Sequence, residues 1–547
     1  MILVQNVKLY FHTIKYLKFS QIFWRLKYRV FVPKTPTVTS ASHLKWLKAW
    51  DAPTWCSINQ WDGGKEFCFL AEKGTIEGPD SWEVDNKSAL WLYNLHYLDC
   101  LNAENGYSLE QEKNLVDSWT QANSDFNNIA WAPYCLSLRI VNLVKWSSKN
   151  GQLSEKMCTS IARQAEYLMG KIEYPIMGNH LFANGKALVF AGAFLTGDIA
   201  HKCLRKGLEI LDCEVKEQFL PDGAHFELSP MYHQILMWDM CDLVLLAQIS
   251  GVEILGERVD GWKSIIIKAD TWRAAMLHPD NEVAFFNDSA MGIAPPTSLI
   301  DNFLVKLGLT PVKRESTKFH DLHHSGYFAI SQALGHKLLI NAAQIEPTYQ
   351  PGHAHADSLS FELSIFGNRL FVNSGTSMYG VTTEREEQRS TIAHNTLTID
   401  NENSSQVWGG FRVAKRARIV HRKCNLVEGD INIEASHDGY VKSTKGSLHK
   451  RKWLSRETSL NITDEIKSDG NAIVRFYLHP SVNVCEVNKQ NLTLDLNNKS
   501  IFFSVSAGEL KVIKCKWYPK FGLSVFNHVI EVTNFDGFVT SQVRWDC

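Results

Sequence analysis

The stretch that decides the fold reads Gly352-His353-Ala354-His355-Ala356-Asp357-Ser358-Leu359-Ser360-Phe361-Glu362-Leu363. In an extended chain, residues i and i+2 point to one face, so His353 and His355 would lie side by side. A turn at Gly367-Asn368 and a second strand over residues 369–373 then predict a β-hairpin. Paired imidazoles at a strand end suit a metal site or an acid–base site, although a histidine on a strand is more often a hydrogen-bonded structural residue.

The period of two continues through the second half of the chain. Residues 389–400 are expected to form another strand, with His394 near its start. Further expected strands cover residues 326–330, 337–341, 417–420, 431–435, 472–478, 492–496, 500–505, 510–516, 523–526 and 528–533. Successive strands with turn residues between them predict a large antiparallel β-sandwich over residues 318–547.

The first half of the chain has a helical period instead. Helices are expected at residues 89–98, 131–146, 161–169, 184–195, 204–219, 231–249 and 262–276. Their connections hold Gly, Pro, Asn and Asp, and no convincing strands lie between them. This pattern predicts an (α/α) toroid over residues 38–317, with the boundary to the second domain in the polar segment 310–325.

Three connections in this half carry more polar residues than a turn needs. Residues 177–184 contain Asn179, His180 and Asn184, and residues 222–233 contain Glu227 and Tyr232 among other polar groups. Residues 285–289 end in Asn-Asp-Ser. Helix capping is the structural alternative for the asparagines. The second connection is harder to explain in this way, because a helix entrance does not need two histidines, a glutamate and a tyrosine.

Composition limits the classes of function. The chain has 547 residues, 45% hydrophobic content and a net charge of -1, so it is long enough for two domains and has no overall charge that favours nucleic acid. No apolar run reaches the roughly 18 residues of a membrane-spanning helix. Twelve cysteines occur without a Cys-x-x-Cys pair. The expected location is cytoplasmic, with reduced thiols.

Residues 1–37 form a basic N-terminal segment. Residues 1–34 hold seven lysines and arginines and no acidic residue, interleaved with apolar side chains. This pattern differs from a signal peptide, whose apolar core carries no charge. It predicts one or two basic amphipathic helices. They would lie peripherally on an anionic inner-membrane surface or, as the alternative, pack on the body of the protein.

The polar motifs together resemble those of the heparinase II/III group of polysaccharide lyases, and more distantly alginate lyases of similar architecture. The matching motifs are Gly178-Asn179-His180 with Asn184, Asp222-Gly223 through Glu227-Leu228-Ser229-Pro230 to Tyr232-His233, Gly352 to Asp357 with Leu359-Ser360-Phe361, and Ala393-His394-Asn395-Thr396. They follow the family's order. The resemblance implies an N-terminal toroid and a C-terminal antiparallel sandwich, as the two periods also do.

The resemblance also implies roles for single residues. Asn179 would neutralise a uronate carboxylate, and Tyr232 and His353 would be catalytic. His355 and His394 would be metal ligands in members that bind zinc or another divalent ion, and Asn373 stands where the family often has an aspartate. A neutral ligand binds a cation more weakly, so no cofactor is required and a Zn or Ca ion is expected to bind weakly or not at all.

Chemistry adds substrate-binding candidates. His180, Asn184 and Glu227 accompany the catalytic motifs, and Arg385 and Arg389 are suited to pair with uronate or sulfate groups. Exposed loop arginines are the alternative for the last two. The expected reaction is β-elimination at a uronic acid of an acidic polysaccharide, with a link to capsule or exopolysaccharide production suggested by the N-terminal segment.

Two other classes of function fit parts of the pattern. A glycoside hydrolase of similar toroid fold would use carboxylates such as Asp222, Glu227 or Asp288. A non-catalytic glycan-binding or assembly protein would keep aromatic clefts around Trp91, Trp131 and Trp408 but would need no tyrosine–histidine pair. An unsaturated product that absorbs in the near ultraviolet separates the lyase from both.

Overall fold

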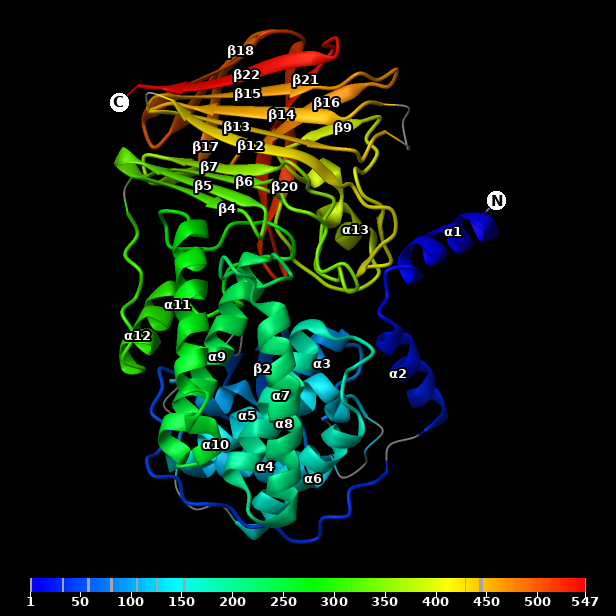
Figure 1. Cartoon of the computed structure of the whole chain (residues 1–547), viewed down its shortest axis with the longest axis vertical. Helices are drawn as coiled ribbons and strands as arrows, with labels where there is room; N and C mark the ends of the chain where they lie inside the picture. Colours follow the sequence, from blue (N-terminus) through cyan, green and yellow to red (C-terminus); the bar gives the residue numbers. More distant parts are fainter. Residues whose placement is uncertain are drawn as a thin grey trace.

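The protein has a helical half and a β half, stacked along the long axis of the molecule (Figure 1). The computed structural model describes residues 2–31, 34–56, 60–78, 82–104, 107–123, 126, 128–150, 154–315, 317–427, 429–441 and 446–546. Helices dominate as far as Lys306, and strands dominate from Lys318 onward. The predicted fold class, a helical toroid domain followed by an antiparallel β-sandwich, is confirmed.

The helical half contains each helix that the sequence predicted. The helices are α3 (Ala89–Tyr97), α4 (Leu109–Ala122), α5 (Pro133–Asn150), α6 (Glu155–Gly170), α7 (Gly178–Phe194), α8 (Gly197–Gln218), α9 (Pro230–Ser250), α10 (Glu253–Gly256), α11 (Val259–Met276) and α12 (Thr297–Lys306). Serine side chains cap α3, α4, α6 and α9 by accepting a hydrogen bond from the third backbone N–H of the helix. These caps set where the helices begin.

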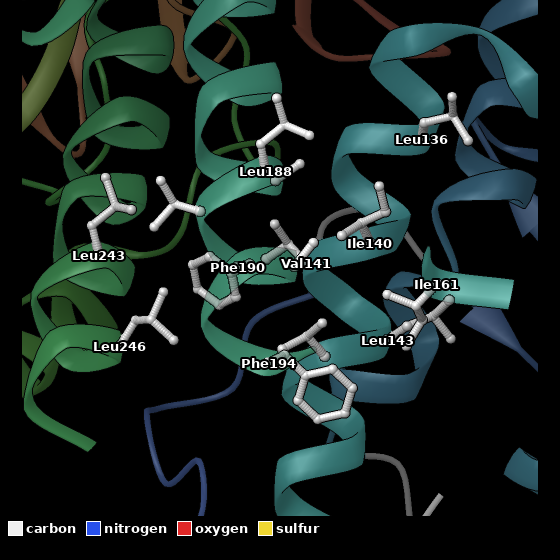
Figure 2. Packing of buried hydrophobic residues seen from close by; sticks show 14 of the residues in the cluster. Leu136, Ile140, Val141, Leu143, Ile161, Leu188, Phe190, Phe194, Leu243 and Leu246 are labelled. Carbon is white, nitrogen blue, oxygen red and sulfur yellow. The ribbon is translucent and has the colours of Figure 1, made fainter. Parts of the chain in front are cut away.

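Helix α7 lies at the centre of this half, between α5 and α9 (Figure 2). Val141 of α5 lies between α5 and α7, next to Phe190 of α7, and Leu243 and Leu246 lie on α9 on the other side of α7 (Figure 2). Almost every residue of α7 is buried. Polar residues on this helix therefore need partners inside the protein, because burying an unpaired polar group is costly.

A small sheet in the helical half was not predicted. It consists of β1 (Gln60–Trp61), β2 (Glu66–Phe69) and β3 (Glu72–Thr75) in the order β1-β2-β3. The strands are too short to show a reliable period in the sequence. Gly74 allows the ring of Trp91 to lie against β3, because a Cβ at this position would come within 2.5 Å of that ring. The sheet thus covers α3.

The β half consists of antiparallel sheets in two layers. One layer is an eight-stranded sheet in the order β12-β13-β14-β15-β22-β19-β18-β17, and the other combines β4-β5-β6-β7-β8 with β20-β21-β16-β9. The larger strands are β5 (Tyr327–Gln332), β6 (His336–Asn341), β7 (Phe361–Ile365), β8 (Asn368–Phe371), β12 (Ile419–Val427), β13 (Asp430–His437), β14 (His449–Ser455), β15 (Ser459–Glu465), β16 (Ala472–Tyr477), β17 (Val482–Val487), β18 (Asn491–Leu496), β19 (Lys499–Val505), β20 (Glu509–Lys520), β21 (Leu523–Thr533) and β22 (Phe538–Trp545). Their inward side chains, including Trp453, Phe476 and Phe503, form one core.

The segment around His353 corrects one expectation. Residues 351–360 form an irregular loop, and strand β7 begins only at Phe361. Around the two histidines the backbone of this loop bonds outside any sheet, and only its last residues, Leu359 and Ser360, bond to Asn341 of strand β6. The carbonyl of His353 accepts from the N–H of Asp288 at 3.0 Å, and the N–H of Ala356 donates to the carbonyl of Arg389 at 2.9 Å. The part of the loop that carries the histidines is therefore fixed from outside the sheet, while its end is bonded to β6.

Two more strand predictions were wrong in detail. Residues 389–400 were expected to be one strand, but they contain the end of helix α13 (Thr383–Arg389), a 3-10 turn and the short strand β9 (Leu397–Ile399). The side chain of Thr382 caps α13 and starts the helix. The two strands expected at residues 523–526 and 528–533 are the single strand β21.

The N-terminal segment forms the two predicted helices, α1 (Ile2–Ile14) and α2 (Phe19–Val30). They lie on one side of the molecule, at the level where the two halves meet (Figure 1). In the described part of the chain no helix is long and apolar enough to cross a membrane. Strand β4 (Lys318–Leu322) opens the β half, and the expected boundary at residues 310–325 stays a prediction.

Candidate active site at the domain boundary

Asn179 lies in the first turn of α7. Gly178 has a φ of +60°, and a Cβ there would come within 2.5 Å of Gln350 and 2.6 Å of Glu227. The chain therefore requires glycine at this turn. The N–H of Asn179 donates to Glu227 Oε1 at 3.0 Å, while its side-chain oxygen is buried and has no hydrogen-bond partner in the described structure. Glu227 thus fixes the backbone of Asn179, and the side-chain oxygen of Asn179 is left without a protein partner among the described residues.

His180 stands next to Asn179 and is partly exposed. Its Nδ1 lies 2.9 Å from Glu173 Oε1, and its ring packs on Tyr134 with ring centres 4.3 Å apart. Burial alone would lower the pKa of His180, but the carboxylate of Glu173 beside it reverses the effect and raises this pKa. The pair keeps a positive charge near Asn179 at a higher pH than a free imidazole would.

Asn184, predicted to bind substrate, is fully buried one turn further along α7. Its side-chain oxygen accepts from the N–H of Glu173 at 2.7 Å, and its side-chain nitrogen donates to Glu173 Oε2 at 2.9 Å and to Ser137 Oγ at 3.0 Å. Both ends of this amide are therefore used inside the protein. In this structure Asn184 holds Glu173 in position, and any effect on a substrate runs through Glu173 and His180.

Tyr232 lies in the first turn of α9. Ser229 caps this helix, and the carbonyl of Leu228 just before it accepts hydrogen bonds from Asn287 Nδ2 at 2.9 Å and from the hydroxyl of Tyr327 at 2.8 Å. The entrance of α9 is thus bonded both to the loop at the domain boundary and to strand β5. Because α7 and α9 both present their N-termini here, their dipoles favour a negatively charged group at this place.

The hydroxyl of Tyr232 meets groups from the β half. It lies 2.9 Å from the hydroxyl of Tyr379, and its ring packs on His353 with ring centres 4.0 Å apart. Burial raises the pKa of Tyr232 well above its ordinary value, and the neighbouring Tyr379 adds to this. Tyr232 therefore carries its proton at neutral pH and can donate it.

Asp288 connects the histidines. His353 Nδ1 lies 2.8 Å from Asp288 Oδ2, and His355 Nε2 lies 2.8 Å from Asp288 Oδ1. Arg385 bonds both carboxylate oxygens through its two terminal nitrogens. Burial alone would raise the pKa of Asp288, but Arg385 and the two histidines hold it well below its usual range.

Because the carboxylate is ionised, it accepts a hydrogen bond from Nδ1–H of His353. The other nitrogen of His353, Nε2, then carries the lone pair when the ring is neutral. This Nε2 lies 3.7 Å from Glu227 Oε2. Burial raises the pKa of Glu227, and His353 opposes that rise. His353 is thus oriented as a proton acceptor directly beside the tyrosine ring.

The two predicted metal-ligand histidines are brought together. His355 Nδ1 lies 3.1 Å from His394 Nε2, while His394 Nδ1 lies 2.8 Å from the carbonyl of Ser390. A carbonyl only accepts, so Nδ1 of His394 holds its proton, and Nε2 of His355 holds the proton that it donates to Asp288. Two lone pairs then face each other. Burial lowers the pKa of His355 to about 4 and that of His394 well below its usual value, so a bridging proton is disfavoured.

This arrangement fits a cation in part. A divalent ion between the two rings would remove the conflict of lone pairs, and each ring already has the outer hydrogen bond that metal-bound histidines usually have. The third predicted ligand, Asn373, uses its side-chain oxygen to accept from the N–H of Asn395 at 3.0 Å. In the described part of the chain no group of three histidine, cysteine or carboxylate side chains is arranged to hold a metal ion.

The two predicted substrate-binding arginines are buried. Arg385 is fully buried against Asp288, and Arg389 donates from two nitrogens to the carbonyl of Ala354, at 3.1 and 2.8 Å. Neither guanidinium is exposed to solvent. In this structure they position the loop that carries His353 and His355, and a direct contact of either one with a substrate stays a prediction.

Three contributors to the site were not predicted. Tyr379 comes from the loop before α13, while Glu173 and Tyr134 support His180. Nothing in the local sequence marks them, because a tyrosine or glutamate in a connection is common. The sequence marks Asp288 as part of a polar connection and as a candidate hydrolase carboxylate, but its link to His353 depends on the meeting of the two halves.

A hollow of about 550 Å³ also lies at the domain boundary, lined by Phe226, Tyr349, His421 and Arg422 among others. It includes none of Asn179, Tyr232 and His353. A volume of this size is common for a ligand site. The convergence of proton-transferring groups instead places the candidate active site around Tyr232 and His353.

Fold and site together define a class: a helical toroid joined to an antiparallel sandwich, with an asparagine, a tyrosine and a histidine at the boundary. The chain matches the N-terminal model of the heparinase II/III family over residues 116–303 and the heparinase II/III-like C-terminal model over residues 314–546. The protein belongs to the heparinase II/III family.

Relatives and solved structures agree with this assignment. A heparin-sulfate lyase of Bacteroides stercoris is 24% identical over 375 residues, which cover 62% of this chain and 54% of that protein. A heparin-sulfate lyase of Pedobacter heparinus is 24% identical over 323 residues, 52% of this chain and 47% of that protein. The chain thus spans about half the length of these relatives.

The fold is shared with a crystal structure of heparinase III, with a TM-score of 0.68 and 17% identity over 86% of this chain and 79% of that one. A chondroitin AC lyase of Streptomyces coelicolor, in complex with chondroitin sulphate, has a TM-score of 0.51 and 10% identity over 84% of this chain and 74% of that one. At these identities the likeness concerns the fold alone.

Proposed function

We propose that the protein is a polysaccharide lyase that cleaves a uronate-containing polymer by β-elimination. The observation that carries the proposal is the contact of Tyr232 with His353 across the domain boundary, with ring centres 4.0 Å apart. A proton donor and a proton acceptor meet there, beside Asn179, whose side-chain oxygen has no hydrogen-bond partner among the described residues. The sequence relatives named heparin-sulfate lyases support a glycosaminoglycan-type substrate as the first choice.

The residues present suffice for each step of the elimination. The uronate carboxylate lies against the Asn179 amide and the two helix N-termini, which stabilise the negative charge that grows on it as the C5–H bond breaks. Nε2 of His353 takes the C5 proton, and the electron pair forms the C4–C5 double bond. As the C4–O4 bond breaks, the hydroxyl of Tyr232 gives its proton to O4. The proton is later returned from His353 to Tyr232 through solvent.

A metal, if one binds, would be held by His355 and His394. It would supply a fixed positive charge behind Asp288, and no step above requires it. The weak divalent binding expected from Asn373 therefore remains our proposal for the cofactor.

The hydrolase alternative is less well supported by the carboxylates. Asp288 is bonded to Arg385, His353 and His355, and its lowered pKa makes it a poor proton donor. Asp222 accepts hydrogen bonds from the N–H and hydroxyl of Ser325, at 2.7 and 2.9 Å. A hydrolase needs one carboxylic acid and one available carboxylate at the scissile bond. Neither aspartate is available for that role.

Two finer points extend the proposal. We infer a reducing compartment, because Cys135, Cys158, Cys203 and Cys241 are buried free thiols. A role in producing or trimming the cell's own capsule or exopolysaccharide is the wider form of the proposal. An absorbance screen for unsaturated products should therefore include that polymer beside heparan and chondroitin chains.

The test is Tyr232→Phe, which removes only the hydroxyl. On a polymer that the wild type cleaves to an ultraviolet-absorbing product, kcat should fall about 10²–10⁴-fold with KM little changed. His353→Ala should cause a loss of similar size, and the double variant should be hardly slower than the slower single one. Near-normal turnover of Tyr232→Phe would contradict the mechanism. Cleavage of the polymer that depends on a carboxylic acid and gives products without ultraviolet absorbance would favour the hydrolase.

Two alanine variants, one at Asn179 and one at Asn184, distinguish a catalytic role from a structural one. Asn179→Ala should lower kcat about 10²–10³-fold, as expected for loss of one preorganised donor, with the melting temperature little changed. Asn184→Ala should lower the melting temperature, because it removes the partners of the N–H and of one carboxylate oxygen of Glu173. If the two variants show the same ratio of kcat loss to stability loss, Asn179 is structural too.

A further inference from the structure

The N-terminal helices are attached to both halves of the molecule. In α1, Tyr10 packs edge-to-face on Trp408 with ring centres 4.9 Å apart, and Trp408 donates to Thr13 Oγ1 at 3.2 Å. In α2, Trp24 stacks on Tyr174 at 4.7 Å, and the hydroxyl of Tyr28 donates to the carbonyl of Ile172 at 3.0 Å. These contacts fix which side of each helix faces the protein.

Lys18 pins the junction between the two helices. Its ammonium group pairs with Glu217 and lies 3.8 Å from the centre of the Tyr349 ring. Gln21, the most buried side chain of the segment, lies on the same side as Trp24 and Tyr28, at helical spacing. Both helices are therefore in contact with the body of the protein at and near their junction and can present a defined outer surface.

The opposite side of both helices is apolar and exposed. Its residues recur at spacings of three and four, which places them on one stripe of each helix. Each is between 49% and 81% exposed, and we call them the outer stripe: Val7, Phe11, Ile14, Phe19, Phe23, Leu26 and Val30. Large apolar side chains gathered on one surface usually mark an interaction site.

Positive charge surrounds the outer stripe. Residues 1–34 hold seven basic residues and no acidic one, in a chain whose net charge is -1. Of these cations, Lys18 alone has a carboxylate partner among the described residues. The β half adds Arg412 beside Tyr10 and Arg416 over Tyr16, at 6.0 and 3.8 Å from the ring centres. The surface is both apolar and strongly basic.

An apolar and basic surface suits some binding partners better than others. A second copy of the chain would bring two basic surfaces together, which like-charge repulsion opposes. A soluble polyanion would use the cations but leave the phenylalanines in water. A bilayer with anionic headgroups satisfies both, because apolar side chains enter the acyl boundary while Lys and Arg meet the phosphates.

We propose that α1 and α2 form a docking surface for an anionic membrane, with the outer stripe inserted at the headgroup boundary. This inference goes beyond the proposed reaction and does not depend on it, since none of its residues belongs to the candidate active site. The protein would bind the surface of the bilayer without crossing it.

The test uses the full chain and sedimentation with vesicles of phosphatidylcholine alone or mixed equally with phosphatidylglycerol. The chain should bind the mixed vesicles, less at high salt, and bind the neutral ones far more weakly. Phe11→Glu/Phe19→Glu/Phe23→Glu should reduce binding at least ten-fold. The matched control is Phe526→Glu/Phe538→Glu, which changes two exposed phenylalanines of the β half, 64% and 52% exposed, and should bind like wild type.

A second set of variants separates the sources of binding. Lys8→Gln/Lys15→Gln/Arg29→Gln should weaken binding to mixed vesicles while the outer stripe is intact. Phe19→Ser alone changes the most exposed side chain of the stripe, at 81%, so it serves if the triple variant folds poorly. Equal vesicle binding by wild type and Phe19→Ser, binding to soluble heparin without vesicle binding, or a stripe-dependent dimer in light scattering would each overturn the proposal.

Discussion

Two regions of the molecule contain nearly the same cluster of side chains. At the domain boundary, Arg385, Asp288, His355 and His394 form a chain of contacts, and inside the sandwich Arg451, Asp464, His449 and His437 form another. In both clusters an arginine donates to both oxygens of an aspartate. The Nε2 atom of a histidine lies 2.8 Å from the aspartate oxygen at the boundary and 2.6 Å from it in the sandwich. The two histidine nitrogens face each other at 3.1 Å in each cluster.

The clusters differ at their far ends. His437 Nδ1 accepts a hydrogen bond from the N–H of Gly439 at 3.0 Å, so its proton sits on Nε2 and is donated to His449. His394 Nδ1 faces the carbonyl of Ser390 and must donate, which leaves Nε2 without a proton. Each histidine N–H in the sandwich cluster therefore meets an acceptor. In the boundary cluster no proton lies between the facing nitrogens of His355 and His394.

This difference separates a structural network from a chemical one. Arg451 also donates to the carbonyls of Leu359 and Asn395, so the sandwich cluster ties β14 to the loops of the site. The boundary cluster carries an additional imidazole, His353, on the same aspartate, and that imidazole contacts Tyr232. We expect both clusters to stabilise the fold and only the boundary cluster to contribute to the rate of the reaction.

The largest effect should come from the two aspartates. Asp288→Asn and Asp464→Asn each leave a buried arginine without its partner, so each should lose about 3–5 kcal/mol of unfolding free energy. Only Asp288→Asn should also lose about 10²–10⁴ in kcat, because His353 would no longer be oriented. Urea unfolding and turnover, measured on folded protein at low temperature, give both quantities. An equal kcat loss in Asp464→Asn would remove the distinction.

A smaller effect concerns pH and the sandwich cluster. Burial lowers the pKa of His437 well below 6.5, so only the unfolded state takes up this proton as the pH falls below 6.5. The stabilising contribution is present above that pH and is lost progressively below it, by up to about 1.4 kcal/mol per pH unit.

His437→Gln can still accept from Gly439 and donate to His449, and it does not titrate. Urea unfolding between pH 7.5 and 5.5 should therefore show a shallower decline for this variant than for wild type. Parallel declines would mean that His437 is already protonated in the folded state, and the closed proton arrangement would be wrong.

The smallest effect is the binding of divalent metal at the boundary cluster. Protein purified without added metal should hold well under one zinc ion per chain, because Asn373 is neutral and its oxygen is used by Asn395. Added zinc, titrated against a chromophoric chelator, should bind weakly. His394→Ala should abolish this binding and His437→Ala should not. Tight stoichiometric zinc in the purified protein would contradict the expectation.

The sequence predicts the parts of this molecule that depend on local pattern. The helices around α7 and the strands of the sandwich follow from their periods, because burial of one face repeats at fixed spacing. Residues 351–360 form a loop and not the expected strand because the backbone partners of His353 and Ala356, including Asp288, lie outside any sheet.

The site shows the same limit. Asn179, Tyr232, His353, His355 and His394 stood out because polar residues crowd their motifs. Tyr379 did not, since its contact with Tyr232 joins residues 147 positions apart and exists only once the two halves are packed. Arg385 and Arg389 were expected to face a polyanion, but a charge can equally be buried to position another charge, and the sequence does not distinguish the two.

The hydrogen bonds at the entrance of α9 have a mechanical consequence. Leu228 is bonded to Asn287 and to Tyr327, and Ser229 donates to the carbonyl of Asp288 at 2.5 Å. The tyrosine of one half is thus fastened to the aspartate and the strand that position the histidine. The two halves are therefore joined by direct hydrogen bonds at this point. Tyr232 and His353, the reacting groups of the proposed mechanism, are therefore held at a fixed spacing.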